Sequence, residues 1–183
     1  MSDKLRILAV GAHPDDIEIC FGGTLALYAQ AGHHVMMAYA TNGNKGHLVI
    51  PPDELAVVRE RESRAAAAVI GAEVFWLDFP DAELFYDAPT RLVFVDMLRQ
   101  ARPDMIFGHW PEAYHPDHVA AGQLAFGANY ISGVPHVKTE HEATVGAAKL
   151  YYMDVHHDIR SEAAEYRSEE HTSELQSPMY LVC

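Results

Sequence analysis

Two short clusters of histidine and aspartate have residue types that could do chemistry: Ala12-His13-Pro14-Asp15-Asp16 and His115-Pro116-Asp117-His118. Neutral imidazole and carboxylate are good zinc ligands, and a catalytic zinc keeps three protein ligands and one open position for water. His13, Asp16 and one histidine of the second cluster would supply that number. Asp15 is then left as a carboxylate that can take a proton as water attacks a carbonyl group. The spare histidine could stabilise an oxyanion or protonate a leaving amine.

For each cluster taken alone, a structural role explains the residues as well as a catalytic or metal-binding role does. The chain has 12 histidines in 183 residues, so some proximity of histidine to aspartate arises by chance. Aspartate before a helix is also a common N-cap. The two clusters together, each directly after a predicted strand, favour a shared site. We expect the following histidines to be surface or loop residues: His33, His34, His136, His141, His156 and His157.

The elements that must position the clusters alternate between strands and helices. Short apolar runs predict strands at Arg6–Val10, His34–Thr41, Glu73–Phe79, Met105–Phe107 and Leu150–Val155. Helical spacing of apolar residues, with Gly or Pro at the ends, predicts helices at Ile17–Gly32, Pro52–Ile70, Thr90–Ala101 and Pro116–Asn129. In the third of these helices the expected core residues are Leu92, Val95, Met97 and Leu98.

This alternation indicates βαβ units with right-handed crossovers. We therefore expect an α/β protein, a Rossmann-like three-layer α/β/α sandwich with a mainly parallel sheet. In such open sheets ligands bind outside the carboxyl ends of the strands. The two clusters can thus converge on one pocket although about a hundred residues separate them.

Composition and charge exclude several classes of protein. A chain of 183 residues fits one domain. Thirteen Lys and Arg against 26 Asp and Glu give a net charge of −13, which argues against nucleic acid or an anionic membrane as the main partner. No apolar run is long enough to span a bilayer, and two cysteines make no disulfide framework. The expected location is the cytoplasm.

The final segment, residues 167–183, departs from the pattern before it. It has no helical or strand period, and it resembles the in-frame translation of a sequencing-library adapter. We expect it to be foreign to the protein, with residues 1–166 forming one domain whose C-terminal part is missing. The alternative is a genuine polar tail.

The two motifs together resemble those of the LmbE-like (PIG-L-type) zinc N-deacetylases, enzymes that deacetylate N-acetylglucosamine conjugates. The resemblance covers roughly residues 5 to 155 and includes, besides the two clusters, Glu18, Gly22-Gly23, Thr41–Gly43, Arg59 with Glu62, and Leu77–Leu84. It implies that His13, Asp16 and His118 bind one zinc ion per chain. It also implies that Asp15 is the general base and that His115 assists at the oxyanion or the leaving group.

Three further residues have less specific implied roles. Arg59 and Asp81 match positions where members of that family contact substrate hydroxyls. Arg59 could equally form a salt bridge with Glu62, three residues along its helix. Asp117 would orient a metal ligand or cap its helix.

The resemblance implies a cytoplasmic, bacterial, zinc-dependent hydrolase that removes an acetyl group from an N-acetylglucosamine-type conjugate. The expected partner is a small N-acylated amino sugar, and self-association into a homo-oligomer stays open.

An amidase acting on a sugar–thiol conjugate is one alternative. Because members of that family usually continue beyond the equivalent of Tyr166, a non-catalytic metal-binding remnant is another. Nitrogen and oxygen ligands also accept Fe2+ or cobalt. A nucleotide-binding Rossmann protein is disfavoured, because the turn at Gly11–Asp15 lacks the G-x-G-x-x-G pattern.

Overall fold

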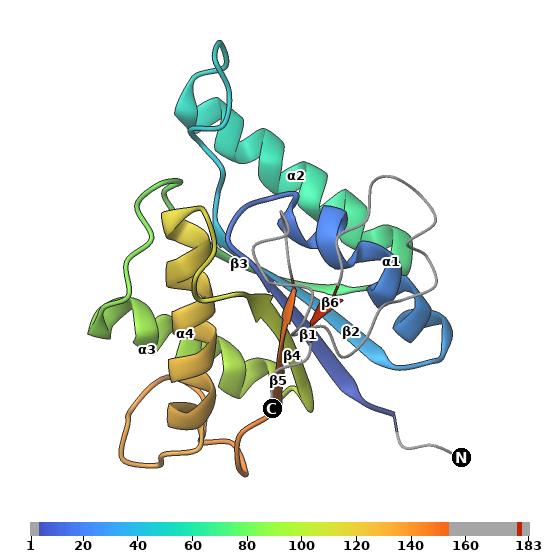
Figure 1. Ribbon diagram of the computed structural model, residues 1–183, viewed down its shortest axis with the longest axis vertical. Coiled ribbons are helices and arrows are strands. Elements are labelled where there is room, and N and C mark those ends of the chain that lie inside the picture. Colours follow the sequence, from blue (N-terminus) through green and yellow to red (C-terminus); the bar gives the residue numbers. More distant parts are fainter. Residues whose placement is uncertain (1–3, 154–178, 181–183) are drawn as a thin grey trace.

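A computed structural model describes residues 4–153 and 179–180 as one α/β unit (Figure 1). Its sheet has the strand order β3-β2-β1-β4-β5-β6. The strands are β1 (Arg6–Gly11), β2 (His34–Thr41), β3 (Glu73–Phe79), β4 (Met105–His109), β5 (Lys149–Met153) and β6 (Met179–Tyr180). The first five pair in parallel, and the two-residue β6 pairs antiparallel with β5. The predicted mainly parallel sheet is confirmed.

Helices cover both faces of this sheet, which confirms the three layers. The helices are α1 (Asp16–Gln30), α2 (Pro52–Ile70), α3 (Ala88–Ala101) and α4 (Pro116–Ser132). Alternate residues of β1 point to opposite faces. Ile7 and Ala9 pack with residues of α1 and α2, whereas Leu8 and Val10 pack with residues of α3 and α4.

The predicted element boundaries agree closely with the structure, because local signals set most of them. Pro52 occupies the first turn of α2, and Gly71 ends the helix with φ 70°, a conformation that favours glycine. The side chain of Asp87 caps α3 by accepting a hydrogen bond from the backbone N–H of Thr90 at 2.8 Å. These signals are readable in the sequence.

Leu92 was predicted to be a core residue and that prediction is wrong, since its side chain is 42% exposed. The buried face of α3 runs through Phe94, Val95 and Leu98. Two residues along a helix correspond to a rotation of about 200°, so Leu92 lies opposite Phe94. Val155, His156, His157 and most of residues 167–183 lie outside the described residues, and the foreign origin of the tail stays a prediction.

The strand order brings the two clusters together. β1 and β4 are neighbours, with Ile7 paired to Met105 and Ala9 paired to Phe107. The loops that follow them therefore leave the same edge of the sheet side by side. Among the described residues no helix is both long and apolar enough to cross a membrane.

Arg99 of α3 holds the segment that follows α4. Its guanidinium group is buried and donates to oxygens of Ser132, Val134, Val137, Thr139 and His141, at 2.8 to 3.3 Å. Four of these acceptors are backbone carbonyls, which need a partner when they are buried. Arg99 therefore fixes the path of the chain from α4 towards β5.

Replacing Arg99 with methionine should lower the free energy of unfolding by about 2–4 kcal/mol, because it leaves the buried carbonyl of Ser132 and three partly buried carbonyls without this donor. Urea unfolding monitored by circular dichroism measures this loss. The matched control is Arg64→Met: Arg64 is half exposed and pairs with Glu60 on the surface of α2. That change should stay within about 0.5 kcal/mol. Equal effects of the two substitutions would contradict the structural role of Arg99.

Candidate active site

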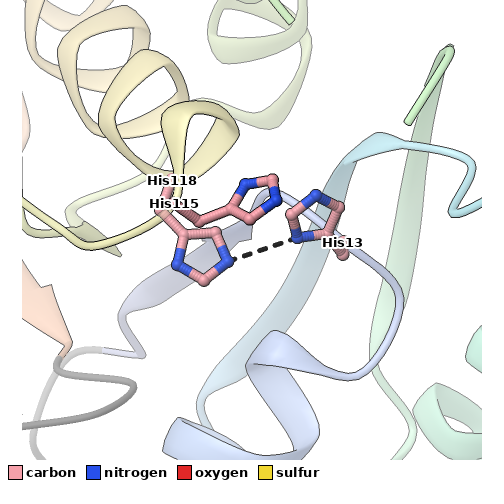
Figure 2. Close-up of side chains that lie close together, drawn as sticks. All are labelled: His13, His115 and His118. Carbon is pink, nitrogen blue, oxygen red and sulfur yellow. Dashed lines mark hydrogen bonds between the residues drawn. The ribbon is translucent and has the colours of Figure 1, made fainter. Parts of the chain in front are cut away.

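Ring nitrogens of His13 and His118 lie close to each other and to the carboxylate of Asp16. His13 Nδ1 lies 3.2 Å from His118 Nε2 and 3.5 Å from Asp16 Oδ2, and His118 Nε2 lies 3.3 Å from Asp16 Oδ1. Figure 2 shows the rings of His13, His115 and His118 gathered together, with a dashed line for the contact between His13 and His118. Tetrahedral zinc with bonds of about 2.0–2.1 Å needs its donor atoms about 3.3 Å apart. The separations between the two ring nitrogens and the Asp16 carboxylate therefore fit such an ion.

Asp16 is the first residue of α1 and is 4% exposed. Its Oδ2 accepts the backbone N–H of His13 at 2.7 Å. Burial alone would raise the pKa of Asp16, but His109, His118 and His13 hold that pKa well below its usual value. The carboxylate therefore stays ionised, as a metal ligand must be.

His13 has carboxylates on both sides of its ring. Its Nε2 lies 3.0 Å from Asp117 Oδ2 and 3.2 Å from Asp81 Oδ1, while Nδ1 faces Asp16 and His118. Burial alone would lower the pKa of His13, but the hydrogen bonds with Asp117, Asp16 and Asp81 raise that pKa to about 12. Such a concentration of negative charge favours a cation at this point. A carboxylate on Nε2 also leaves Nδ1 as the nitrogen available to a metal.

His118 is suited to bind as a neutral ring. Burial lowers its pKa although Asp16 acts in the opposite direction. The side chain is 1% exposed, and its Nδ1 has no hydrogen-bond partner among the described residues. Its Nε2 is the atom that faces Asp16 and His13.

Asp15 has a very different environment from its neighbour Asp16. Its backbone has φ 116°, which is strained for a residue other than glycine, and its side chain is 52% exposed. Burial of part of the carboxyl and the charge of Asp16 raise its pKa, and Arg59 offsets part of that rise. A carboxylate with a raised pKa is better suited to accept a proton.

Arg59 of α2 contacts Asp15 and Pro14 as well as Glu62, the salt-bridge partner that the sequence analysis named. One nitrogen, Nη2, donates to Asp15 Oδ2 at 2.7 Å and to the carbonyl oxygen of Pro14. The other, Nη1, donates to Glu62 Oε2 at 3.3 Å. The salt bridge with Glu62 is therefore present, and the same side chain also holds the loop that carries Asp15.

His115 is the N-cap residue of α4. Its Nδ1 accepts the backbone N–H of Asp117 at 3.1 Å, so the proton of the neutral ring resides on Nε2. Burial, together with the charges of His13 and His118, lowers the pKa of His115. Its ring centroid lies 4.7 Å from that of His13. Capping this helix was one of two roles considered for Asp117, and in the structure His115 is the residue that caps it.

Asp117 and Asp81 link the loop after β3 to the site. The buried carboxylate of Asp117 accepts backbone N–H groups of Ala82 at 2.8 Å and Leu84 at 3.3 Å, besides facing His13. This geometry matches the expected role of orienting a ligand. Asp81 points Oδ1 at His13, and its Oδ2 accepts the backbone N–H of Lys45 at 3.3 Å.

The sequence analysis did not identify His109, the last residue of β4. It is fully buried, and its Nε2 lies 3.1 Å from Asp16 Oδ2. It belongs to neither cluster, so residue spacing gave no reason to select it. Its place at the carboxyl end of a strand was the signal that could have found it.

Comparisons with known proteins show which family and fold this chain is similar to. Residues 8–129 match the sequence profile of the family described as GlcNAc-PI de-N-acetylase, PIG-L. The chain is 33% identical over 141 residues to diacetylchitobiose deacetylase of Thermococcus kodakarensis, covering 74% of this chain and 53% of that protein. It is 29% identical over 168 residues to 4-oxalmesaconate hydratase of Pseudomonas putida, covering 87% and 64%.

Solved structures include a similar fold. The N,N'-diacetylchitobiose deacetylase of Pyrococcus horikoshii superposes with a TM-score of 0.78 and 27% identity, covering 84% of this chain and 62% of that one. The present chain therefore spans roughly half to two thirds of the length of the relatives it matches.

Replacing Asp117 with asparagine should make the free energy of unfolding depend less on pH in the acid range. Burial alone would raise the pKa of Asp117, but His13 and the two backbone N–H groups hold it below its usual value. Its stabilising contribution is therefore present above about pH 4 and is lost as the pH falls through the lowered pKa. The free energy of unfolding, measured by urea titration from about pH 5 to about pH 3, should decline less steeply in the variant. An unchanged slope would contradict this assignment.

Proposed function

The chain belongs to the GlcNAc-PI de-N-acetylase (PIG-L) family, and on that premise we propose that it is a metal-dependent hydrolase that removes an acetyl group from an N-acetylglucosamine-type conjugate. The observation that carries this proposal is the convergence of His13 Nδ1, His118 Nε2 and the Asp16 carboxylate, at separations of 3.2 to 3.5 Å. The carboxyl of the adjacent Asp15 is close enough for the charges of Asp16 and His13 to shift its pKa. Because the chain is shorter than the relatives that it matches, its activity and substrate both belong to this proposal.

In this proposal His13 binds the ion through Nδ1, Asp16 through a carboxylate oxygen and His118 through Nε2. Zinc is the proposed ion, one per chain, and Fe2+ suits the same nitrogen and oxygen donors. A zinc ion in such a site polarises a carbonyl and lowers the pKa of water to about 7. The carboxylate of Asp117 holds the His13 ring so that Nδ1 faces the site.

Asp15 is the proposed general base. As water adds to the amide carbonyl, its carboxylate accepts the proton that the water loses. The raised pKa favours that transfer, and the guanidinium of Arg59 keeps the carboxylate in place at 2.7 Å. As the tetrahedral intermediate collapses and the C–N bond breaks, protonated Asp15 can give the same proton to the leaving nitrogen, so that a neutral amine and acetic acid, which ionises to acetate, are released.

His115 is the proposed donor to the oxyanion. Because its Nδ1 accepts from the backbone of Asp117, its Nε2–H is available to the substrate. A neutral ring can donate this hydrogen bond without giving up its position as helix cap. Charge that develops on the amide oxygen would strengthen the bond, which favours the transition state over the bound amide.

Arg59 and Asp81 are the proposed contacts for sugar hydroxyls, since both lie at the rim of the site and are partly exposed. The proposed partner is a small N-acylated amino sugar in a bacterial cytoplasm. An amidase acting on a sugar–thiol conjugate would break the same type of bond with the same residues. The similarity to a hydratase means that the assay must also measure addition of water to a carbon–carbon double bond.

Release of acetate by the zinc-loaded chain from N,N'-diacetylchitobiose tests this proposal directly. Asp15→Asn should reduce turnover by roughly 10²–10⁴-fold while zinc content stays nearly unchanged, because the amide cannot accept the proton. The control Asp53→Asn removes an exposed carboxylate on α2 and should leave turnover unchanged. Loss of stoichiometric zinc from Asp15→Asn would show that Asp15 is a ligand. A wild-type chain that binds zinc but releases no acetate would favour the non-catalytic remnant.

The two histidines of the second cluster should respond differently to substitution. His118→Ala should lose the metal, because it removes one of three ligands, whereas His115→Ala should retain it and lose turnover. Zinc per chain after dialysis, measured by atomic absorption, distinguishes the two. The reverse pattern would exchange their roles.

A further inference from the structure

We propose that His109 is a positioning residue that fixes Asp16 and His118 in the orientation that binds the metal. This inference rests on the proposed function, because it concerns the same metal site. It adds a residue that belongs to neither sequence cluster. His109 is the last residue of β4, and its side chain is fully buried behind the site.

His109 contacts two of the three proposed ligands. Its Nε2 lies 3.1 Å from Asp16 Oδ2, the carboxylate oxygen opposite the one that faces His118. Its ring stacks on the ring of His118, with the centroids 4.1 Å apart and the planes 16° from parallel. His118 Nδ1 has no hydrogen-bond partner among the described residues, so the ring is oriented by the contacts of Nε2 with Asp16 and His13 and by ring packing. Among the described rings that contact His118, that of His109 has the shortest centroid distance.

His109 also joins β4 to the loop that carries His13. The backbone N–H of Ala12, the residue after β1, points at His109 Nε2 at 2.9 Å. One imidazole nitrogen can accept from Ala12 or donate to Asp16, but it cannot do both at once. A glutamine amide at this position can do both, because its oxygen accepts while its NH2 group donates. Glutamine should therefore replace the polar function of His109, although it is a poor metal ligand.

The test is the zinc affinity of the full chain, measured by competition with a chromophoric chelator. His109→Phe keeps a ring against His118 and removes both nitrogens, and it should weaken zinc binding 10- to 100-fold, the usual cost of losing such a partner. His109→Gln should bind zinc nearly as tightly as the wild type. His109→Asn, one methylene shorter, should fail to reach Asp16 and bind more weakly than His109→Gln.

Two further measurements separate positioning from simple loss of structure. Circular dichroism and thermal melting of the metal-free variants report folding. The visible absorption spectrum of the Co2+-substituted protein reports ligand geometry, and it should change in His109→Phe but not in His109→Gln. The surface control is His136→Phe, because His136 is exposed and follows the C-terminal end of α4, whereas His115 and His118 lie at its N-terminal end.

The outcomes distinguish this inference from the proposed function. A wild-type chain that binds no stoichiometric zinc would overturn both. Wild-type zinc affinity in His109→Phe would overturn only the role of His109. An equal, severe loss of zinc affinity in His109→Phe and His109→Gln would also overturn the positioning role, because that result would make His109 itself a ligand. Should the Phe variant fail to fold, the comparison of Gln with Asn decides the question.

Discussion

The ionised carboxylate of Asp16, buried at the start of α1, is the interaction on which the rest of the site depends. Taking a carboxylate out of water costs several kcal/mol unless donors and positive charge surround it. Here the N-terminus of a helix, the backbone N–H of His13 and three histidine rings supply that environment. The histidines thus stabilise the charge that would in turn hold a metal, so one cluster has both a structural and a functional role.

The order of the strands makes this arrangement available. His13 and Asp16 follow β1, and His109 ends β4, which pairs directly with β1. The long connection between these strands places β2 and β3 on the other side of β1, and the loop after β3 returns to the site through Asp117. A carboxylate of α4 therefore fixes a loop from the opposite half of the sheet. Any shift of β4 against β1 would move His109 and His118 relative to His13 and Asp16.

Much of this could be predicted from the sequence, because it depends on local signals. Strand and helix limits follow apolar runs, prolines and glycines, and the two clusters stand at strand ends. The wrong prediction and the missed residue both depend on how the elements pack against one another. Leu92 has the composition of a core residue, but the sheet contacts the other face of α3. His109 has no motif around it, and only the pairing of β1 with β4 shows that its nitrogen reaches Asp16.

The neighbours Asp15 and Asp16 show how one motif yields two chemical roles. The strained backbone of Asp15, at φ 116°, turns its side chain away from the direction that Asp16 takes into the protein. Strain of this kind costs about 1–3 kcal/mol and persists only where surrounding contacts enforce it. The contacts of Arg59 with Asp15 and Pro14 provide that enforcement. The pKa of Asp15 is raised and that of Asp16 is lowered. Backbone conformation, the contact of Arg59 with Asp15 and the histidines around Asp16 thereby separate two identical side chains into a proposed proton acceptor and a proposed ligand.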